Sequence, residues 1–302
     1  MSVSHNETTK PQGWRIWWLA ARPRTLPAAI VPVLVGSAIA IRNGQFQLLP
    51  FLAAFLASLL IQIGTNYAND LFDHLKGADH QRQGPTRAVQ SGLVTPSQMR
   101  NAVILVFGVA ALLGLSLIYV GGWPIAVIGA LSILAGIAYT GGPYPLAYHG
   151  LGDLFAFLFF GVIAVTGTAY IFTHEFTGLA LIASLPVALL VTAIIVVNNL
   201  RDIPTDTAVG KRTFAVMLGD RRTRYEYTLC LLGAYLFPIG LAALAGSIGW
   251  WWLPFLTLPL AFQLVRTVLH GQAGPALNKT LGQTAQLHLW FGIALSLSIL
   301  LS

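Results

Sequence analysis

The sequence NYANDLFDHLKGAD, at residues 66–79, follows directly on a long apolar run, and NLRDIPTDTAVGKRT, at residues 199–213, follows on another. The chain has only 10 aspartates and glutamates among its 302 residues. Half of them lie in these two stretches, namely Asp70, Asp73, Asp79, Asp202 and Asp206. Carboxylates are therefore scarce in this chain and concentrated at the ends of two apolar segments.

The apolar runs have the length and composition of membrane-spanning helices. The chain is 56% hydrophobic and 9% charged, whereas about 25% of residues are charged in a soluble domain. Spanning helices need ~20 apolar residues, and nine windows come close to that length: residues 25–41, 47–69, 101–119, 123–140, 151–172, 178–198, 226–246, 251–269 and 285–301. The sequence predicts an all-α membrane bundle of about nine spans. Residues 1–21 are expected to form a cytoplasmic or interfacial segment and residues 22–302 a single membrane domain.

The basic residues predict the orientation of this bundle in the lipid bilayer. If the spans alternate in direction, every lysine and arginine except Arg42 falls on the side that carries the two acidic stretches. Positive residues favour the cytoplasmic side, so we expect a multi-pass protein of the cell (inner or plasma) membrane with a cytoplasmic N-terminus and an external C-terminus. The net charge of +7 then reflects membrane topology, and we expect no nucleic-acid partner. The oligomeric state stays open.

Both acidic stretches have a spacing that suits metal binding. Residues at i, i+3, i+4 and i+7 of a helix share one face. Oxygen-bearing side chains occupy such positions: Asn66, Asn69, Asp70 and Asp73 in the first stretch, and Asn199, Asp202 and Asp206 in the second. Mg²⁺ prefers oxygen ligands, usually one or two carboxylates together with substrate phosphates. We predict that the aspartates bind Mg²⁺ and a diphosphate and that the asparagines contact the substrate. Pro204 is expected to kink or end the second helix, which makes the shared face of its aspartates less secure.

Basic residues follow each acidic stretch: Arg82 and Arg87 after the first, and Lys211 and Arg212 after the second. Guanidinium groups bind phosphate oxygens bidentately, and lysine supplies a point charge. These four residues are therefore candidates for diphosphate binding. Topology alone also favours basic residues on this side, and a single acidic stretch could be an ordinary solvated loop. Two such stretches in a chain with so little acid favour the metal site.

Several motifs together resemble those of the UbiA superfamily of intramembrane prenyltransferases. They are RPRTLPA at residues 22–28, NDLFD at 69–73 with KGAD after it, GPTRAVQSG at 84–92, YTGGPYPLAYHGLGD at 139–153, and NNLRDIPTD at 198–206 with GKRT after it. The similarity extends over residues 22–219, and it is strongest to the menaquinone branch of the superfamily. The wider superfamily often has a further aspartate four residues after Asp73, where this chain has Gly77. That difference leaves the role of Asp79 open.

The resemblance implies an all-α bundle around a central cavity that cytoplasmic loops cap. It also implies Mg²⁺-dependent transfer of a polyprenyl group from its diphosphate to 1,4-dihydroxy-2-naphthoate, with loss of the ring carboxylate, which gives demethylmenaquinone. Another aromatic acceptor, such as 4-hydroxybenzoate, homogentisate or a chlorin, is the alternative within the family. A transporter is the alternative from another class. It would place charged residues near span centres, whereas the acids of this chain other than Glu175 lie toward the cytoplasmic span ends or in the N-terminal tail.

Three further residues are candidates for the reaction. Tyr139, in a motif shared with the family, would stabilise an allylic cation with its aromatic face, by roughly 0.5 to 2 kcal/mol. Arg22 would bind the carboxylate of the acceptor or anchor the chain at the membrane interface. Asp153 would orient the acceptor or act as a base, or it would complement the dipole of the helix that it begins. The FAFLFF run at residues 155–160 is expected to face lipid or pack against other helices rather than wall a prenyl groove.

Overall fold

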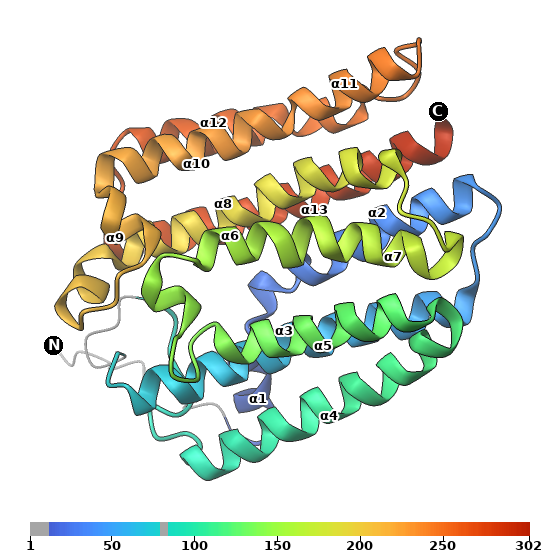
Figure 1. The fold of residues 1–302 in the computed structure, drawn as a ribbon. Coiled ribbons are helices and arrows are strands. Elements are labelled where there is room, and N and C mark those ends of the chain that lie inside the picture. Colours follow the sequence, from blue (N-terminus) through green and yellow to red (C-terminus); the bar gives the residue numbers. More distant parts are fainter. Residues whose placement is uncertain (1–11, 79–83) are drawn as a thin grey trace, which may run out of the picture.

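The computed structural model describes residues 12–78 and 84–302, and these form helices joined by loops (Figure 1). The α-helices are α1 Trp14–Ala21, α2 Pro27–Arg42, α3 Leu48–Leu75, α4 Pro96–Gly121, α5 Trp123–Ala138, α6 Gly152–Ala156, α7 Ala164–Thr173, α8 Gly178–Ala208, α9 Phe214–Leu218, α10 Asp220–Ala234, α11 Leu236–Leu244, α12 Leu258–Leu269 and α13 Leu277–Leu301. The other helical segments are the 3₁₀ helices η1 Pro23–Thr25, η2 Leu146–His149, η4 Leu253–Thr257 and η5 Gly274–Ala276, and the π-helix η3 Phe157–Ile163. The expected all-α class is confirmed.

The described part of the chain contains 6 helices that are long and apolar enough to cross a membrane. A seventh span is possible if the pair Trp14–Thr25 and Pro27–Arg42, bent by 57°, crosses as one. The remaining apolar helices, Trp123–Ala138 and Leu253–Leu269, are shorter than 18 residues. They coincide with two of the predicted windows. The structure therefore supports a multi-pass membrane protein, and the count of nine spans stays a prediction because these two helices fall short of a full span.

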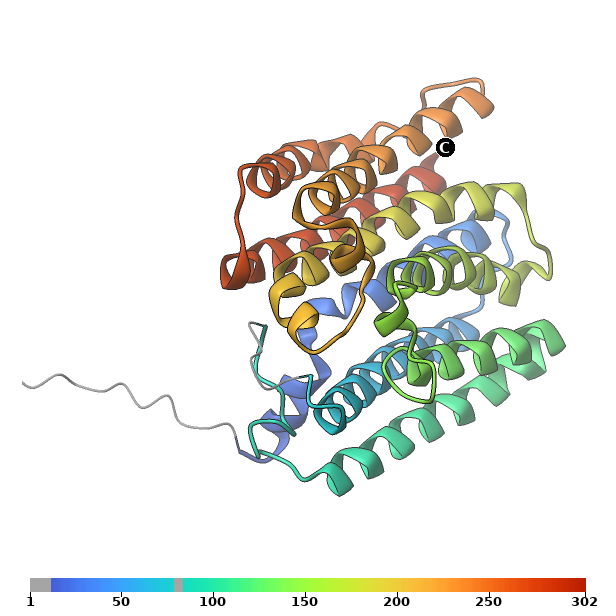
Figure 2. The same ribbon diagram turned by 60° about the vertical axis from the view of Figure 1, so that its left-hand side comes forward.

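The packing places α2, α8 and α13 at the centre of the bundle. The α10–α12 hairpin covers α8 and α13 on one side, while α3, α4 and α5 lie on the other side (Figures 1 and 2). The largest buried apolar cluster joins side chains of α2, α8, α10 and α13. A second cluster joins α1, α3, α4 and the loop before α4. The helices that carry the two acidic stretches thus belong to separate clusters, and both helices line the cavity that lies between them.

The ends of α3 and α8 place the acidic stretches at the same end of the bundle. Gly77 has φ 70, a left-handed conformation that glycine adopts without steric cost. The Ala78 amide then donates to the Asp73 carbonyl at 2.9 Å and closes the end of α3. Gly77, which stands where the wider superfamily often has an aspartate, thus terminates the helix in this chain.

The helix α8 continues through Pro204 to Ala208. Of the predicted kink or end at this proline, the end is therefore wrong. Proline removes one backbone hydrogen bond, but Pro204 lies near the end of the helix, where the Val209 amide still donates to the Thr205 carbonyl at 3.3 Å. Asp202 and Asp206 therefore lie four positions apart in a continuous helix, and both are buried. Their shared face is preserved.

Candidate active site

A cavity of about 450 Å³ lies between α2, α3, α4, α5, η3 and α8. Polar side chains gather at the end where α3 and α8 terminate: Arg22, Thr25, Gln62, Asn66, Asn69, Asp73, Arg87, Tyr139, Thr140, Asn198, Asn199, Asp202 and Lys211. The rest of the wall is almost entirely aliphatic and aromatic. The cavity can therefore hold a ligand with a charged head and a long apolar tail.

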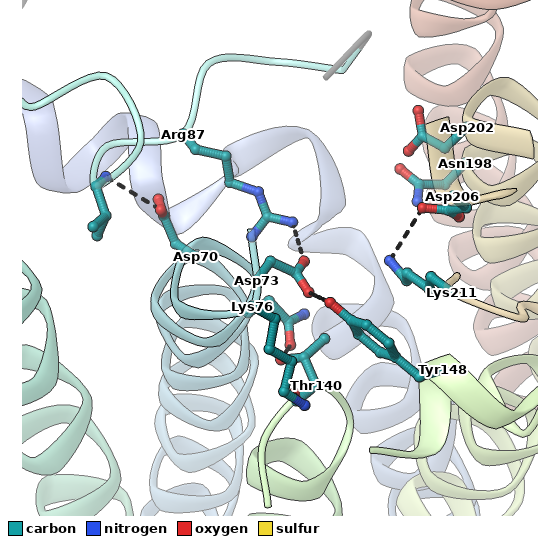
Figure 3. A network of polar contacts seen from close by, with 12 residues as sticks. Asp70, Asp73, Lys76, Arg87, Thr140, Tyr148, Asn198, Asp202, Asp206 and Lys211 are labelled. Carbon is teal, nitrogen blue, oxygen red and sulfur yellow. Dashed lines mark hydrogen bonds and ion pairs between the residues drawn. The ribbon is translucent and has the colours of Figure 1, made fainter. Parts of the chain in front are cut away.

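On the α3 side, Asp73 is the centre of the polar network (Figure 3). Its Oδ2 accepts a hydrogen bond from Arg87 Nη2 at 2.6 Å, and its Oδ1 accepts one from the Tyr148 hydroxyl at 2.9 Å. Asp73 and Arg87 are both buried. A buried carboxylate stays ionised only when such partners compensate its desolvation. The network thus holds the Asp73 carboxylate in place at the cavity wall.

Asp70 has a different position from Asp73. Its two carboxylate oxygens accept hydrogen bonds from the backbone amides of Ala88 and Val89, at 2.8 and 3.2 Å. Asp70 is not among the described residues that line the cavity. Successive residues of a helix point about 100° apart, and Asp70 is turned from the cavity toward the loop before α4. The structure therefore gives Asp70 the geometry of a loop anchor, and its role as a metal ligand stays a prediction.

The asparagines of the first stretch connect α3 to neighbouring segments. Asn66 Nδ2 donates to the Ala21 carbonyl at 2.9 Å, at the end of α1. Asn69 Oδ1 accepts from the Thr140 hydroxyl at 2.9 Å, in the loop after α5. Both asparagines are buried and line the cavity. They are positioned to contact a ligand while they also hold the walls together.

On the α8 side, Asp202 is paired with Arg201, which is 1% exposed. Arg201 Nε and Nη2 donate to Asp202 Oδ1 and Oδ2, at 2.8 and 2.5 Å. Nη2 also donates to Asn198 Oδ1 and Nη1 donates to Asn278 Oδ1, each at 2.8 Å. The Asn278 contact ties this pair to α13. A guanidinium that makes four donor contacts is well satisfied in a buried setting, and Asp202 is thereby held at the cavity.

Asp206 lies one turn further along α8. Its Oδ1 is 3.5 Å from Lys211 Nζ, while its Oδ2 is buried and has no hydrogen-bond partner among the described residues. Asn199, one turn before Asp202, also lines the cavity. Figure 3 shows Asp202 and the Asp206–Lys211 pair on the α8 side, facing the group around Asp73.

Cations from both sides meet at the polar end. Lys76 Nζ donates to the Thr140 carbonyl at 2.7 Å and lies 4.7 Å from the centre of the Tyr148 ring. Desolvation lowers the pKa of Lys76, and nearby Asp73 opposes this shift while Lys211 adds to it. Together with Arg87 and Lys211, this lysine gives the site several positive groups near its carboxylates. Such a mixed set suits a diphosphate that binds together with a cation.

The remaining predicted residues are distributed as follows. Arg22 ends α1 with φ 53 and lines the cavity, as does Tyr139. Asp153 is buried, and neither of its carboxylate oxygens has a hydrogen-bond partner within the described part of the chain. Arg212 is exposed, so the structure does not bring its side chain to the cavity. The predicted residues Asp79 and Arg82 lie outside the described residues.

The donor set fits Mg²⁺ that is held jointly with a diphosphate. Among the described residues, no three His, Cys, Asp or Glu side chains converge on one point, so a metal cage built by protein alone is not present there. Mg²⁺ typically takes one or two carboxylates and completes its shell with phosphate oxygens and water. Asp73, Asp202 and Asp206 supply carboxylates on two sides of the polar end, and the orphan Oδ2 of Asp206 lacks the partner that a buried anion requires.

Some residues of the site carried no individual prediction from the sequence. In the sequence, Lys76, Arg201 and Thr140 carry no role of their own and lie only within the motifs KGAD, NNLRDIPTD and YTGGPYPLAYHGLGD. The FAFLFF run was expected to avoid the groove, yet Phe155, Phe159 and Phe160 line the cavity. Phe155 lies in α6, and Phe159 and Phe160 lie in the π-helix η3. Phe155 and Phe159 are four positions apart, a spacing that shares one helix face, but the spacing does not tell which face meets the cavity.

Comparison with known proteins shows the family of this chain. Residues 29–292 match the UbiA prenyltransferase family. The chain is 36% identical over 294 residues to 1,4-dihydroxy-2-naphthoate octaprenyltransferase of Escherichia coli (strain K12), covering 95% of each protein. It is 38% identical over 283 residues to the enzyme of the same name from Mycobacterium tuberculosis (strain ATCC 25618 / H37Rv), covering 93% of this chain and 95% of that protein.

The fold is also that of a solved structure, a UbiA homologue from Archaeoglobus fulgidus bound to GPP and Mg²⁺. The TM-score is 0.65 at 15% identity, with 93% of this chain and 99% of that chain covered. The family match covers most of the chain, and the curated relatives align over nearly their whole length. The chain therefore belongs to the UbiA prenyltransferase family.

Proposed function

We propose that this protein transfers a polyprenyl group from polyprenyl diphosphate to 1,4-dihydroxy-2-naphthoate, with loss of the ring carboxylate as CO₂ and release of diphosphate, to give demethylmenaquinol, the hydroquinone form of demethylmenaquinone. The observation that carries the proposal is the cavity, which combines a polar end of carboxylates and cations with a long apolar wall. The acceptor follows from the similarity to relatives that are named as 1,4-dihydroxy-2-naphthoate octaprenyltransferases.

The polar end is the place for the diphosphate. Arg87 and Lys211 line it, and their positive charge would stabilise the negative charge that develops on the diphosphate as it leaves. Mg²⁺, held by Asp73, Asp202 and Asp206, would add electrostatic stabilisation of the same oxygens when bound. The proposed cofactor agrees with the Archaeoglobus fulgidus homologue, which was solved with GPP and Mg²⁺.

The apolar wall is the place for the prenyl chain and for the reacting carbon. Phe155, Phe159 and Phe160 supply aromatic surface on this wall, which excludes the water that would otherwise capture an allylic cation. The ring of Tyr139 lies at the cavity and would stabilise the cation by roughly 0.5 to 2 kcal/mol. Arg22, which lies between α1 and η1, would bind the carboxylate of the naphthoate. The ring carbon of the acceptor forms the new bond as the carbon–oxygen bond to diphosphate breaks.

We further propose that the protein lies in the cell membrane with its active site at the cytoplasmic face. Apart from Arg42, the described arginines and lysines lie toward the end of the bundle that holds the site or in the loops at that end, which the positive-inside rule assigns to the cytoplasm. The C-terminus would then lie outside. The single domain of residues 22–302 is part of the same proposal.

An acceptor panel tests the proposed function. Purified protein in detergent is incubated with Mg²⁺, a polyprenyl diphosphate and either 1,4-dihydroxy-2-naphthoate, 4-hydroxybenzoate or homogentisate. We expect prenylated product and CO₂ from the naphthoate alone, and no product once EDTA removes the metal. Asp73→Asn should abolish turnover, whereas Asp220→Asn, in the separate Asp220–Arg224 pair, should not. Turnover of another acceptor without the naphthoate would refute the assignment.

A further inference from the structure

Tyr148, in η2, contacts both sides of the polar end. Its hydroxyl donates to Asp73 Oδ1 at 2.9 Å, on the α3 side. Its carbonyl accepts from the Arg212 amide at 3.2 Å, on the segment that follows α8. Figure 3 shows the Tyr148 ring between the group around Asp73 and the group around Asp206 and Lys211. A single residue therefore connects the two acidic stretches, which are far apart in sequence.

The ring of Tyr148 also has a lysine from each stretch beside it. Lys76 Nζ lies 4.7 Å from the ring centre and Lys211 Nζ lies 5.3 Å from it. An ammonium group within about 6 Å of an aromatic face is attracted by the ring quadrupole. Two ammonium groups would otherwise repel each other at the same site. The aromatic ring therefore adds to the Asp206 carboxylate, 3.5 Å from Lys211 Nζ, in stabilising two cations at this place.

The backbone around Tyr148 holds the ring in position. The Tyr148 amide donates to the Pro145 carbonyl at 3.0 Å, and the Ala147 amide donates to the Tyr139 carbonyl at 2.9 Å. Gly150 follows with φ 76 and lies so close to Met217 that an added Cβ would meet its sulfur at 2.7 Å. The segment is therefore fixed to α5 on one side and packed against α9 on the other.

We propose that Tyr148 is a positioning residue for the diphosphate site. Its hydroxyl orients the Asp73 carboxylate, and its ring sets the places of Lys76 and Lys211, so that one carboxylate and two cations from opposite sides are ready for the incoming diphosphate. This inference rests on the proposed function, because it assumes that a diphosphate binds at the polar end. It assigns separate roles to the hydroxyl and to the ring, and two substitutions can separate them.

Tyr148→Phe removes the hydroxyl and keeps the ring, whereas Tyr148→Leu removes both. Tyr144→Phe and Tyr144→Leu are matched controls, because Tyr144 belongs to the same loop but is exposed and stacks on His149 at 3.7 Å. Two binding measurements need no prenyl transfer: Mn²⁺ binding followed by electron paramagnetic resonance, and calorimetric titration with inorganic pyrophosphate in the presence of Mg²⁺. The KM values for polyprenyl diphosphate and for the naphthoate complete the set.

We expect Tyr148→Phe to weaken Mn²⁺ binding and to raise the half-saturating Mg²⁺ concentration by about tenfold, the size expected for loss of one hydrogen bond to a charged group. Its KM for polyprenyl diphosphate should stay unchanged. Tyr148→Leu should in addition weaken pyrophosphate binding and raise that KM. The KM for the naphthoate should not move in either variant, and the Tyr144 variants should behave as wild type.

The inference is overturned if both Tyr148 variants bind Mn²⁺ and pyrophosphate as the wild type does. It is also overturned if they lose thermal stability and kcat together while metal and pyrophosphate affinities stay unchanged, since Tyr148 would then support the fold only. The binding measurements use only Mn²⁺, Mg²⁺ and pyrophosphate, so they test this inference even if the naphthoate is not the acceptor. Failure of the proposed function and failure of this inference are therefore distinguishable.

Discussion

At the scale of single residues, the neighbours Asp70 and Asp73 show how one sequence motif divides between two tasks. Asp73 lines the cavity with Arg87 and the Tyr148 hydroxyl as its partners. Asp70 accepts two backbone amides of the loop at residues 84–92. Since Arg87 lies in that loop, Asp70 acts on the site through the placement of Arg87. Substitution of Asp70 and substitution of Asp73 should therefore have different effects on the loop and on prenyl transfer.

We predict that Asp70→Ala leaves the Ala88 and Val89 amides without their acceptor and loosens the loop. Hydrogen exchange at residues 84–92 should become faster, because a lost hydrogen bond to a charged acceptor costs about 1.5 to 3 kcal/mol. Prenyl transfer should fall through weaker diphosphate binding. Asp73→Ala is the comparison variant: it should abolish transfer while the Ala88 and Val89 amides exchange as before. Unchanged exchange in Asp70→Ala would show that the loop does not depend on this carboxylate.

At the scale of elements, the π-helix η3 determines the shape of the apolar wall. Gly161 packs directly on α8, and a Cβ added there would overlap both the backbone and the side chain of Ala188. This close approach brings η3 against α8 and leaves Phe159 and Phe160 at the cavity. The close packing of η3 on α8 therefore depends on the absence of a side chain at Gly161.

We predict that Gly161→Ala pushes η3 away from α8. Overpacking of this kind typically costs about 1 to 3 kcal/mol, which unfolding in mixtures of SDS and mild detergent would measure as a lower free energy of unfolding. The KM for polyprenyl diphosphate should rise because the aromatic wall moves. Gly108→Ala, on α4 where an added Cβ meets nothing within 4 Å, should be neutral or slightly stabilising. Equal effects of the two substitutions would contradict the packing argument.

At the scale of the whole molecule, the loops at the two ends of the bundle differ in charge. The segments that follow α3 and α8 carry the site, while the loop between α2 and α3 lies at the opposite end (Figure 1). The C-terminal end of α13 lies near that loop, since Arg42 Nη1 donates to the Ile299 carbonyl at 3.4 Å. The proposed orientation therefore places this loop and the C-terminus together on the outer side.

We predict that Gln45→Cys and Thr207→Cys are labelled from opposite sides of the membrane. Both positions are exposed, and both substitutions are made in a Cys230→Ser background because Cys230 is the single cysteine of the chain. A membrane-impermeant maleimide should label Gln45→Cys in right-side-out vesicles and Thr207→Cys only in inverted vesicles. Labelling of Thr207→Cys from the outer side would reverse the proposed orientation, and labelling of both from one side would exclude it.

The sequence by itself determined the class of the fold, the family and the acidic helix ends, because hydropathy and helical spacing are local properties that a linear pattern records. Asn66, Asn69 and Asp73 lie at the cavity as their spacing predicted, and Asp202 and Asn199 do so on α8. The spacing could not separate Asp70 from Asp73, because which part of a helix face meets the cavity depends on the rotation of α3 against its neighbours.

Only the tertiary structure decided which residues from distant segments meet. Arg201 pairs with Asp202 and is tied to Asn278 on α13, and Tyr148 joins Asp73 to the segment after α8. These contacts depend on helix packing and on loop conformation, which the order of residues along the chain does not encode locally. The two acidic stretches were visible in the sequence, and the tyrosine that connects them became visible only in the folded molecule.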